Sequence, residues 1–570
     1  MAGTQSSAIE GVRGSLLPSR HSRLDAMLSL LLAGQLLGQG VPPPEPQGNQ
    51  LLWSQALAFD HDGMPMVPVG IMEGRKKLQF RLLTRAELLV GEGSEERSIR
   101  LRKGSIVEMT LKASEAGELR HFLVTDRYPM AERQAAHEAL AEWRQKGFPR
   151  ARLLPLGISF GLTGTGFDNR ALALALDHRR SQQQAEKLQR KIRKHHALET
   201  TIQTVASLLP AGQIQTRVGR RRYQGGNRMA LRPDAGHRGA FVVVIGVEFG
   251  EGYAWHGFEN RRYAGQVEVV LDATGHLALV VVTRAEDLVA GTVPSESYVQ
   301  APLAALQAQA IASRTELFSK LGHRHGGAPW LLVDDQRDQV YKGEGARHPN
   351  SDKAVQTTRG KLLFEGKKLS HAYYSSMCGG HTEDNDHVWD QDPSPVLRGQ
   401  LDGIEAAPPR NDDEALEQWI EEDEAQPWCR RSTRSSAKYY RWSRRVRTQE
   451  IADKLTELGL ADLRSWQIQG RGVSGRILQM QLRDSKGRTA LLNRELPIRR
   501  FFQQLPSALF VVHADRDESG QVTALHFRGR GWGHGVGMCQ VGAIGMAEAK
   551  HSVEEILEHY YRGATVRTAY

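Results

Sequence analysis

The stretch that decides the fold covers residues 293–315 and reads VPSESYVQAPLAALQAQAIASRT. Its second half repeats Leu and Ala at helical spacing, which predicts a helix with an apolar face. Pro302 suits the first helical position because proline has no N–H group to leave unpaired there. We therefore expect a helix to begin at Pro302 and to pack its apolar side into a core.

Glu296 precedes this predicted helix on a turn. A turn forces few backbone hydrogen bonds, so the side chain can project into a groove, and Glu296 is a candidate acid catalyst. A simpler role is also open, in which the carboxylate stabilises the helix N-terminus by up to about 1 kcal/mol. The choice between these roles depends on the other motifs of the chain.

Upstream of Glu296 the sequence is typical of a β-sheet. Apolar residues alternate or run together over residues 241–246, 265–271 and 276–283, between turn residues. Strands followed by helices predict an α+β fold with a mixed C-terminal domain over residues 240–570. An acidic run followed by a basic one indicates a charged insert in this domain, near residues 404–446.

The first 240 residues predict a smaller N-terminal accessory region. We interpret residues 1–50 as a leader and linker, in which an apolar run only loosely resembles a signal peptide. Residues 51–165 combine short apolar runs with a helical pattern, which indicates a small α+β domain. Within a basic helical segment over residues 166–239, the Leu and Ala spacing of residues 171–208 predicts a long exposed helix.

The composition limits the partners. The chain of 570 residues has 75 Lys and Arg against 65 Asp and Glu, and this basic excess favours polyanionic partners such as nucleic acid, anionic lipid or an acidic cell wall. No apolar run reaches the roughly 18 residues of a membrane-spanning helix, so we expect no membrane span. No recognised nucleic-acid-binding signature is present, and we expect no nucleic-acid partner, although the basic residues 186–222 keep that alternative testable.

Two more stretches carry side chains suited to chemistry. The first, residues 371–383, reads HAYYSSMCGGHTE, and the second, residues 529–546, reads GRGWGHGVGMCQVGAIGM. Alternate glycines in the second let the backbone approach a ligand closely, while Trp532 and His534 offer a stacking face and a polar head. This combination suits a sugar-binding groove. The Lys-Ser/Thr ending of a phosphate loop is missing, which disfavours a nucleotide site.

Histidines and cysteines gather around the first of these stretches. His371, Cys378 and His381, with Cys539 farther along the chain, are metal-ligand types, but their spacing matches no standard zinc pattern. Both a structural role and a zinc site stay open. Three cysteines in the chain are too few for a disulfide framework.

Taken in order, these motifs resemble those of the SpoIID/LytB family, the stage II sporulation protein D type. The matching segments are VPSE with LQAQAIASRT, then CGGHT at 378–382, then residues 529–537 with HYYRG at 559–563. The resemblance implies a peptidoglycan lytic transglycosylase. Such an enzyme cleaves the β-1,4 bond between N-acetylmuramic acid (MurNAc) and N-acetylglucosamine (GlcNAc), preferentially on strands stripped of stem peptides, and leaves a 1,6-anhydroMurNAc end.

The resemblance also assigns roles to residues. Glu296 matches the catalytic glutamate, and one carboxyl group suffices because the sugar's own 6-hydroxyl is the nucleophile, unlike in two-carboxylate glycosidases. Protonating the leaving oxygen requires a pKa raised by an apolar groove. The resemblance implies that the groove is lined by Arg314, Ser376, Thr382, Trp532 and His534. No cofactor is required, but some members bind zinc near the Cys-Gly-Gly loop, which implies a possible site at His371, Cys378 and His381.

The family leaves a second function open. LytB-type relatives are described as enhancers of a cell-wall N-acetylmuramoyl-L-alanine amidase, and this chain could bind the wall without cutting it. The VPSE setting of Glu296 favours catalysis. Either function implies peptidoglycan glycan strands as a partner and export to the cell envelope, on the periplasmic or wall side. The enhancer function adds a cell-wall amidase as a partner.

Overall fold

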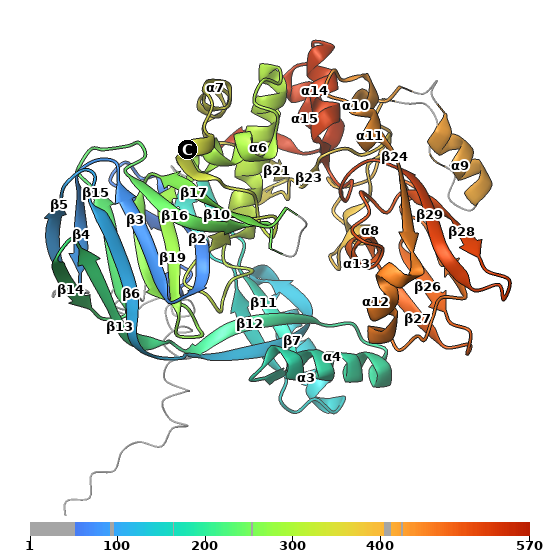
Figure 1. Cartoon of the computed structure of the whole chain (residues 1–570), viewed down its shortest axis with the longest axis horizontal. Coiled ribbons are helices and arrows are strands. Elements are labelled where there is room, and N and C mark those ends of the chain that lie inside the picture. Colours follow the sequence, from blue (N-terminus) through green and yellow to red (C-terminus); the bar gives the residue numbers. More distant parts are fainter. Residues whose placement is uncertain are drawn as a thin grey trace, which may run out of the picture.

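The computed structural model describes residues 52–91, 96–162, 165–251, 255–403, 408, 412–422 and 426–570. The leader predicted over residues 1–50 and part of the insert predicted near 404–446 lie outside the described residues. Sheets and helices are mixed throughout, which confirms the predicted α+β class (Figure 1). Among the described residues, no helix is both long enough and apolar enough to cross a bilayer.

Two antiparallel sheets enclose most of the largest core. The larger sheet has the order β1 (Ala58–Phe59), β2 (Pro65–Arg75), β19 (Leu277–Arg284), β18 (Gln266–Leu271), β15 (Arg228–Pro233), β4 (Ala86–Val90) and β5 (Arg97–Leu101), and β20 (Leu332–Val333) pairs in parallel with β2. The second has the order β14 (Arg221–Gly225), β13 (Ala211–Val218), β6 (Ile106–Glu115), β3 (Lys77–Leu82), β16 (Val242–Phe249) and β17 (Gly257–Tyr263). Apolar side chains of both sheets belong to one buried cluster, which makes them a single unit.

Both sheets cross the boundary that the sequence predicts at residue 240. Strand β15, before it, pairs with β18, after it, and β3 pairs with β16 in the same way. The predicted strands after residue 240 are confirmed as β16, β18 and β19. The accessory region and the C-terminal part therefore share a core, because the strands that complete each sheet come from either side of this boundary.

A smaller module lies between β6 and β13 in the sequence. Its sheet has the order β12 (Thr201–Leu208), β7 (Glu118–Pro129), β11 (Ala171–Arg179) and β8 (Arg152–Leu156), and α3 (Arg133–Gln145) and α4 (Gln182–His196) pack against it. In Figure 1 this module lies below the other parts of the chain.

The long helix predicted over residues 171–208 is wrong at both ends. Only α4 is helical, between the strands β11 and β12. The sequence ALALAL has a period of two, so Leu174 and Leu176 enter one buried cluster while Ala173 and Ala175 enter another on the opposite face. Helix α4 ends at Ala197, which has a left-handed backbone. The basic segment 166–239 is thus mainly β-structure.

Helix α6 (Leu303–Lys320) is the central element of the chain. It confirms the predicted helix, with Pro302 as its N-cap, and it is buried around most of its circumference. Around it lie α5 (Ala285–Glu296), α7 (Pro349–Thr357), α14 (Gln540–Glu548), α15 (Val553–Tyr560) and β21 (Lys361–Glu365), which pairs with β31 (Thr565–Thr568). The many alanines of α6 allow this close approach from several sides.

A C-terminal lobe with its own core faces the sheets across the helices (Figure 1). It contains one sheet of β24 (Arg441–Arg447), β29 (Val522–Arg530) and β28 (Phe510–Arg516), and a second of β25 (Ser465–Ile468), β26 (Gln479–Arg483) and β27 (Thr489–Asn493). Its helices include α9 (Asp413–Glu421), α12 (Ala452–Glu457) and α13 (Glu495–Phe501). The short parallel pair of β23 (Tyr374–Ser375) and β30 (Met538–Cys539) brings together the segments that precede and follow the lobe in the sequence.

Candidate functional site

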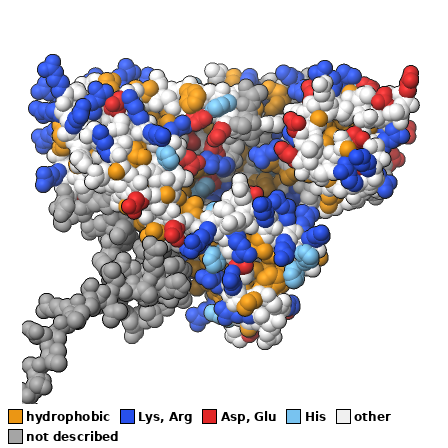
Figure 2. Space-filling view, turned by 60° about the horizontal axis from the view of Figure 1, so that its bottom comes forward, with side chains coloured by type: hydrophobic (Ala, Val, Ile, Leu, Met, Phe, Trp, Pro, Cys, Tyr) orange, Lys and Arg blue, Asp and Glu red, His pale blue; other side chains and the backbone are white. Residues whose placement is uncertain are grey.

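A pocket of about 400 Å³ lies where α5, α6 and the glycine-rich loop meet. The face drawn in Figure 2 is hollowed between the parts of the chain, with acidic and basic side chains along the sides of the hollow. The pocket is lined by Glu296, Glu316, Lys320, Arg324, residues 336–339, residues 373–376, Trp389, Gln391, residues 532–534 and Gln540. Residues that are far apart in the sequence thus meet in one place.

Glu296 is the last residue of α5 and is half-buried in this pocket. The sequence places it on a turn, but the helix continues through Pro294 and ends only at Ser297, whose backbone is extended. The Val340 N–H donates a hydrogen bond of 2.6 Å to Oε1 of Glu296, and Gln540 Nε2 donates one of 2.9 Å to its carbonyl oxygen. The first contact holds the carboxyl group, and the second holds the backbone of the same residue.

Burial raises the pKa of the Glu296 carboxyl above its ordinary value. The Val340 N–H and the charge of Lys320 act in the opposite direction, but burial outweighs both. A raised pKa keeps a larger fraction of this side chain protonated near neutral pH, as a general acid requires.

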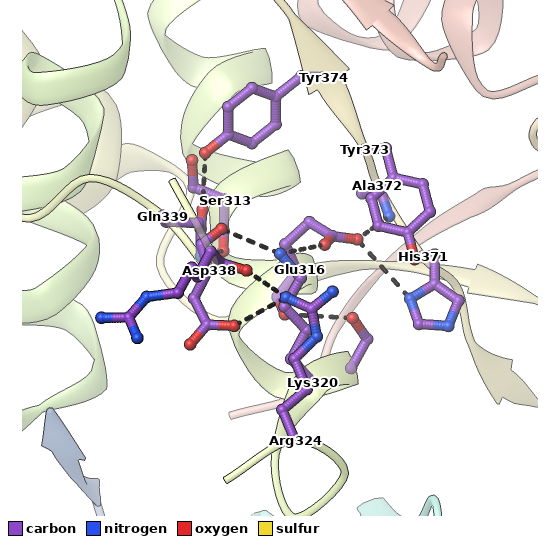
Figure 3. A network of polar contacts seen from close by, with 12 residues as sticks. Ser313, Glu316, Lys320, Arg324, Asp338, Gln339, His371, Ala372, Tyr373 and Tyr374 are labelled. Atoms are coloured by element: carbon purple, nitrogen blue, oxygen red, sulfur yellow. Dashed lines mark hydrogen bonds and ion pairs between the residues drawn. The ribbon is translucent and has the colours of Figure 1, made fainter. Parts of the chain in front are cut away.

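The two other carboxylates that line the pocket behave differently (Figure 3). Burial opposes ionisation of Glu316, yet Lys320, His371 and the Ala372 N–H lower its pKa to about 2. Its Oε2 lies 3.0 Å from Nζ of Lys320, and the Ala372 N–H donates to Oε1 at 2.6 Å. Glu316 is therefore a fixed anion at neutral pH.

Asp338 is likewise a fixed anion. Burial again opposes ionisation, but His325 and Arg324 help to lower the pKa of Asp338 to about 2. His325 Nε2 lies 2.7 Å from Oδ2, which also accepts the Val333 N–H at 2.8 Å. Of the three carboxyl groups in the pocket, Glu296 alone has a raised pKa.

Aromatic rings form one wall of the pocket. Trp389 packs on His534 with ring centroids 4.8 Å apart and on Tyr373 at 4.5 Å, and Trp532 meets Tyr439 edge-on at 4.5 Å. Rings of this kind present apolar faces on which sugar rings can stack.

His534 is held as a neutral ring in this wall. Burial, with the charges of Arg476 and Arg499, lowers the pKa of His534 to about 3. Nδ1 accepts the Val536 N–H at 3.0 Å, so Nε2 carries the proton and donates it to the Tyr374 carbonyl at 3.0 Å. Both nitrogens are thus engaged within the protein, and His534 contributes shape rather than charge.

Tyr374 and Gln339 place polar groups beside Glu296. The Tyr374 hydroxyl donates a hydrogen bond of 2.8 Å to Oε1 of Gln339, whose Nε2 donates to the Ser313 carbonyl at 3.1 Å (Figure 3). Burial and the charge of Glu296 keep the pKa of Tyr374 well above its ordinary value, so the hydroxyl stays protonated.

The chain is similar to known proteins over the part that holds this site. Residues 273–364 match the family model described as Stage II sporulation protein. Over 298 residues the chain is 27% identical to Stage II sporulation protein D of Bacillus amyloliquefaciens, covering 50% of this chain and 74% of that relative. Over 300 residues it is 26% identical to the Amidase enhancer of Bacillus subtilis, covering 48% of this chain and 40% of that relative. These matches support the assignment of the chain to the SpoIID/LytB family.

Two further matches extend beyond this segment. Residues 383–537 match a family model described as Domain of unknown function (DUF8618), which takes in most of the C-terminal lobe. An uncharacterised protein of Brachyspira hyodysenteriae is 25% identical over 343 residues, which cover 60% of this chain and 80% of that relative. The segment that matches this second family model contributes Trp389, Trp532 and His534 to the pocket.

Four of the site residues expected from the family resemblance meet in the pocket, and two do not. Glu296, Ser376, Trp532 and His534 line it. Arg314 is fully buried on α6, where its Nε and Nη2 donate to the two carboxylate oxygens of Glu286 at 2.7 and 2.8 Å. Thr382 is also buried, and its Oγ1 accepts the Gln400 N–H at 2.9 Å.

The alternate glycines of the glycine-rich segment allow close packing between two segments of the chain. Gly531, Gly533, Gly535 and Gly537 all have positive φ. A Cβ at Gly537 would lie 2.0 Å from the Tyr373 carbonyl oxygen, so no other residue fits without movement of the backbone. The sequence predicts that this backbone approaches a ligand closely. In the structure the backbone at Gly537 instead approaches the backbone at Tyr373.

The zinc ligands implied by the resemblance do not converge. His371 is exposed, with Nδ1 3.8 Å from Glu316 Oε1, whereas His381 is buried, with Nδ1 2.6 Å from the Thr382 carbonyl. Cys378 lies instead beside Cys429 and Cys539. His371, Cys378 and His381 therefore do not fit one ion.

Sequence reasoning missed several pocket residues. Glu316 and Lys320 stand one turn apart on α6, directly after the LQAQAIASRT motif, and this spacing could have indicated an ion pair facing the same groove. Asp338 and Gln339 also line the pocket, and no local sequence pattern indicated a role for them. Trp389 lies in the stretch that follows the Cys-Gly-Gly motif.

Proposed function

We propose that this protein is a peptidoglycan lytic transglycosylase in which Glu296 is both the acid and the base. The observation that carries the proposal is that Glu296 alone, among the three carboxyl groups of the pocket, has a raised pKa. A glycosidase with two catalytic carboxylates would need a second free group nearby, whereas Glu316 and Asp338 are both committed to ion pairs.

The reaction balances with this single group. The protonated Glu296 donates its proton to the glycosidic oxygen, and the bond from C1 of MurNAc to that oxygen breaks, which frees the 4-hydroxyl of GlcNAc. The 6-hydroxyl of the same MurNAc then attacks C1 and forms the 1,6-anhydro ring, while the carboxylate accepts its proton. The carboxyl group is protonated again at the end, and no water is consumed.

The rest of the pocket suits a glycan strand. The wall of Tyr373, Trp389 and Trp532 offers stacking faces, and the hydroxyl of Tyr374 lies among amide groups that can bond sugar hydroxyls. Arg324 lines the pocket with a side chain that is 45% exposed. It suits the lactyl carboxylate that MurNAc exposes when its stem peptide is absent.

The test is to digest purified glycan strands, with and without stem peptides, and to analyse the products by mass spectrometry. We expect anhydro-ended fragments from the wild type and none from Glu296→Gln. Glu457→Gln, at an exposed position of α12, is the matched control and should cleave normally. Cleavage by Glu296→Gln at the wild-type rate would exclude Glu296 as the acid.

The second candidate function is enhancement of a wall amidase, and the similarity to the Amidase enhancer of Bacillus subtilis favours it. The same pocket would then bind glycan strands without cutting them. Retained glycan binding with no cleavage by wild type or variant, together with stimulation of a wall amidase, would favour this function. In either case we propose that the chain acts outside the cytoplasm, in the cell envelope, on peptidoglycan.

A further inference from the structure

All three cysteines of the chain meet in one buried cluster with an aspartate. Cys378 follows β23, and Asp402 follows α8 (Asn385–Val388). Cys429 is on α10 (Trp428–Arg431), and Cys539 is the N-cap of α14. Each residue offers one ligand atom, these four atoms lie within 4.8 Å of one another, and all four residues are fully buried. The cluster is outside the catalytic pocket.

The spacing of the sulfur atoms suits a single tetrahedral ion. Sγ of Cys378 and Sγ of Cys429 lie 3.7 Å apart. Two thiolates on one zinc ion, each about 2.3 Å from the metal at the tetrahedral angle, are separated by about 3.8 Å. Iron–sulfur clusters are held by four cysteine thiolates, one more than this group of residues contains.

The surroundings of the cluster favour ionised ligands. Sγ of Cys539 accepts the N–H groups of Cys378 at 3.2 Å and of Gly542 at 3.3 Å. Asp402 accepts the Cys429 N–H and the Tyr560 hydroxyl. Hydrogen bonds of this kind orient metal ligands and stabilise their negative charge.

A buried arginine lies against the same cluster. Arg476 is 1% exposed, and its Nη2 donates a hydrogen bond of 2.9 Å to the Cys378 carbonyl. Ionised thiols and a carboxylate buried together are costly without positive charge. Arg476 supplies part of that charge, and a divalent cation at the centre of the four ligand atoms would supply the rest.

We propose that Cys378, Asp402, Cys429 and Cys539 bind one structural Zn²⁺ ion. Three sulfurs and one oxygen complete a closed tetrahedral set, which leaves no open position for chemistry. The site replaces the set of His371, Cys378 and His381 that the family resemblance implies. It joins α10, in the charged insert, to the segment that carries Ser376 and to the start of α14, whose first residue, Gln540, lines the pocket.

Metal content of the full-length chain tests the proposal. The protein is produced in zinc-supplemented medium without a histidine tag, desalted and measured by inductively coupled plasma mass spectrometry. We expect about one zinc ion per chain. Cys429→Ser and Asp402→Asn should lower zinc affinity by at least about tenfold, whereas the control His371→Ala should keep the metal. The proposal is overturned if the wild type contains no zinc. It is also overturned if His371→Ala loses zinc while Cys429→Ser and Asp402→Asn keep it.

A second measurement uses the wild type alone, in case the variants do not fold. Replacement of zinc by Co²⁺ should give the intense near-ultraviolet thiolate-to-cobalt absorption and the visible bands of a tetrahedral site. Alkylation after denaturation should label all three cysteines. A disulfide between any two of them, or a cobalt spectrum without thiolate bands, overturns the proposal, and neither result depends on glycan cleavage.

Discussion

The Val340 N–H points at Oε1 of Glu296 from 2.6 Å, and no described residue donates to Oε2. One oxygen is therefore held by the protein while the other is left for the substrate. A proton on Oε2 can face a glycosidic oxygen in the pocket without breaking the bond to Val340. This arrangement connects the position of Glu296 at the end of α5 with its proposed role.

The pH dependence of cleavage should follow Glu296. The acid form is the active form, so kcat/KM is expected to fall as the pH rises through the raised pKa of this carboxyl group. Rates of fragment release from stripped glycan strands, measured from pH 4 to 9, would show this limb. A rate that increases steadily with pH would contradict the assignment of Glu296 as the acid.

Replacing Glu296 by Gln should have opposite effects on stability and activity at high pH. The folded chain holds the Glu296 proton more firmly than the unfolded chain, so the free energy of unfolding falls as the pH rises from the ordinary pKa of 4.5 through the raised value. Glu296→Gln cannot ionise, so it avoids this decrease in the free energy of unfolding and should have a higher Tm than the wild type at pH 8. Its rate of cleavage should be lower by about 100-fold or more. Thermal unfolding of both proteins at pH 4 and pH 8 separates the effects, because the Tm difference should shrink at pH 4.

Arg324 should determine the preference for stripped strands. Arg324→Met removes a cation from the pocket, and we expect KM for stripped strands to rise about tenfold through loss of one charged hydrogen bond. Strands that keep their stem peptides have no free lactyl carboxylate and should change little. The control Arg500→Met removes an exposed arginine elsewhere in the C-terminal lobe. An equal effect on both substrates would mean that Arg324 does not contact the carboxylate.

His534 should make the protein sensitive to acid. Between the ordinary pKa of 6.5 and the folded value of about 3, the unfolded chain binds a proton at this histidine that the folded chain does not. The free energy of unfolding therefore falls as the pH drops through this window. His534→Gln should lose less stability than the wild type between pH 6.5 and 5, in urea unfolding. His61→Gln, at a side chain that is 79% exposed, should behave like the wild type.

Local sequence patterns predicted the helices and strands that are buried among apolar residues. The Ala and Leu spacing of α6 indicated a helix because burial on most sides demands small apolar residues. The strands after residue 240 were recognisable for the same reason. The pattern ALALAL before α4 was wrongly predicted as helix, because leucine and alanine are compatible with both a helix and a strand. In the structure it is the strand β11, whose leucines and alanines pack on opposite faces.

Motif matching located Glu296 but could not show where neighbouring side chains point. Arg314 and Thr382 fall within motifs, yet their side chains are buried in the interior. The cluster of Cys378, Cys429 and Cys539 had no spacing signal at all, because it forms only when segments 161 residues apart meet. Such sites depend on tertiary structure rather than on sequence periodicity.

Arg314 should therefore act on stability and not on catalysis. Arg314→Met leaves Glu286 without its bidentate partner, and breaking a buried pair should lower the free energy of unfolding by about 3 kcal/mol. Arg314→Lys keeps the charge but loses the paired geometry, so it should lie in between. Urea unfolding gives the stability, and kcat/KM measured well below the Tm should stay within about twofold of the wild type. A variant with unchanged stability and a raised KM for glycan strands would instead indicate that Arg314 binds the substrate, as the family resemblance implies.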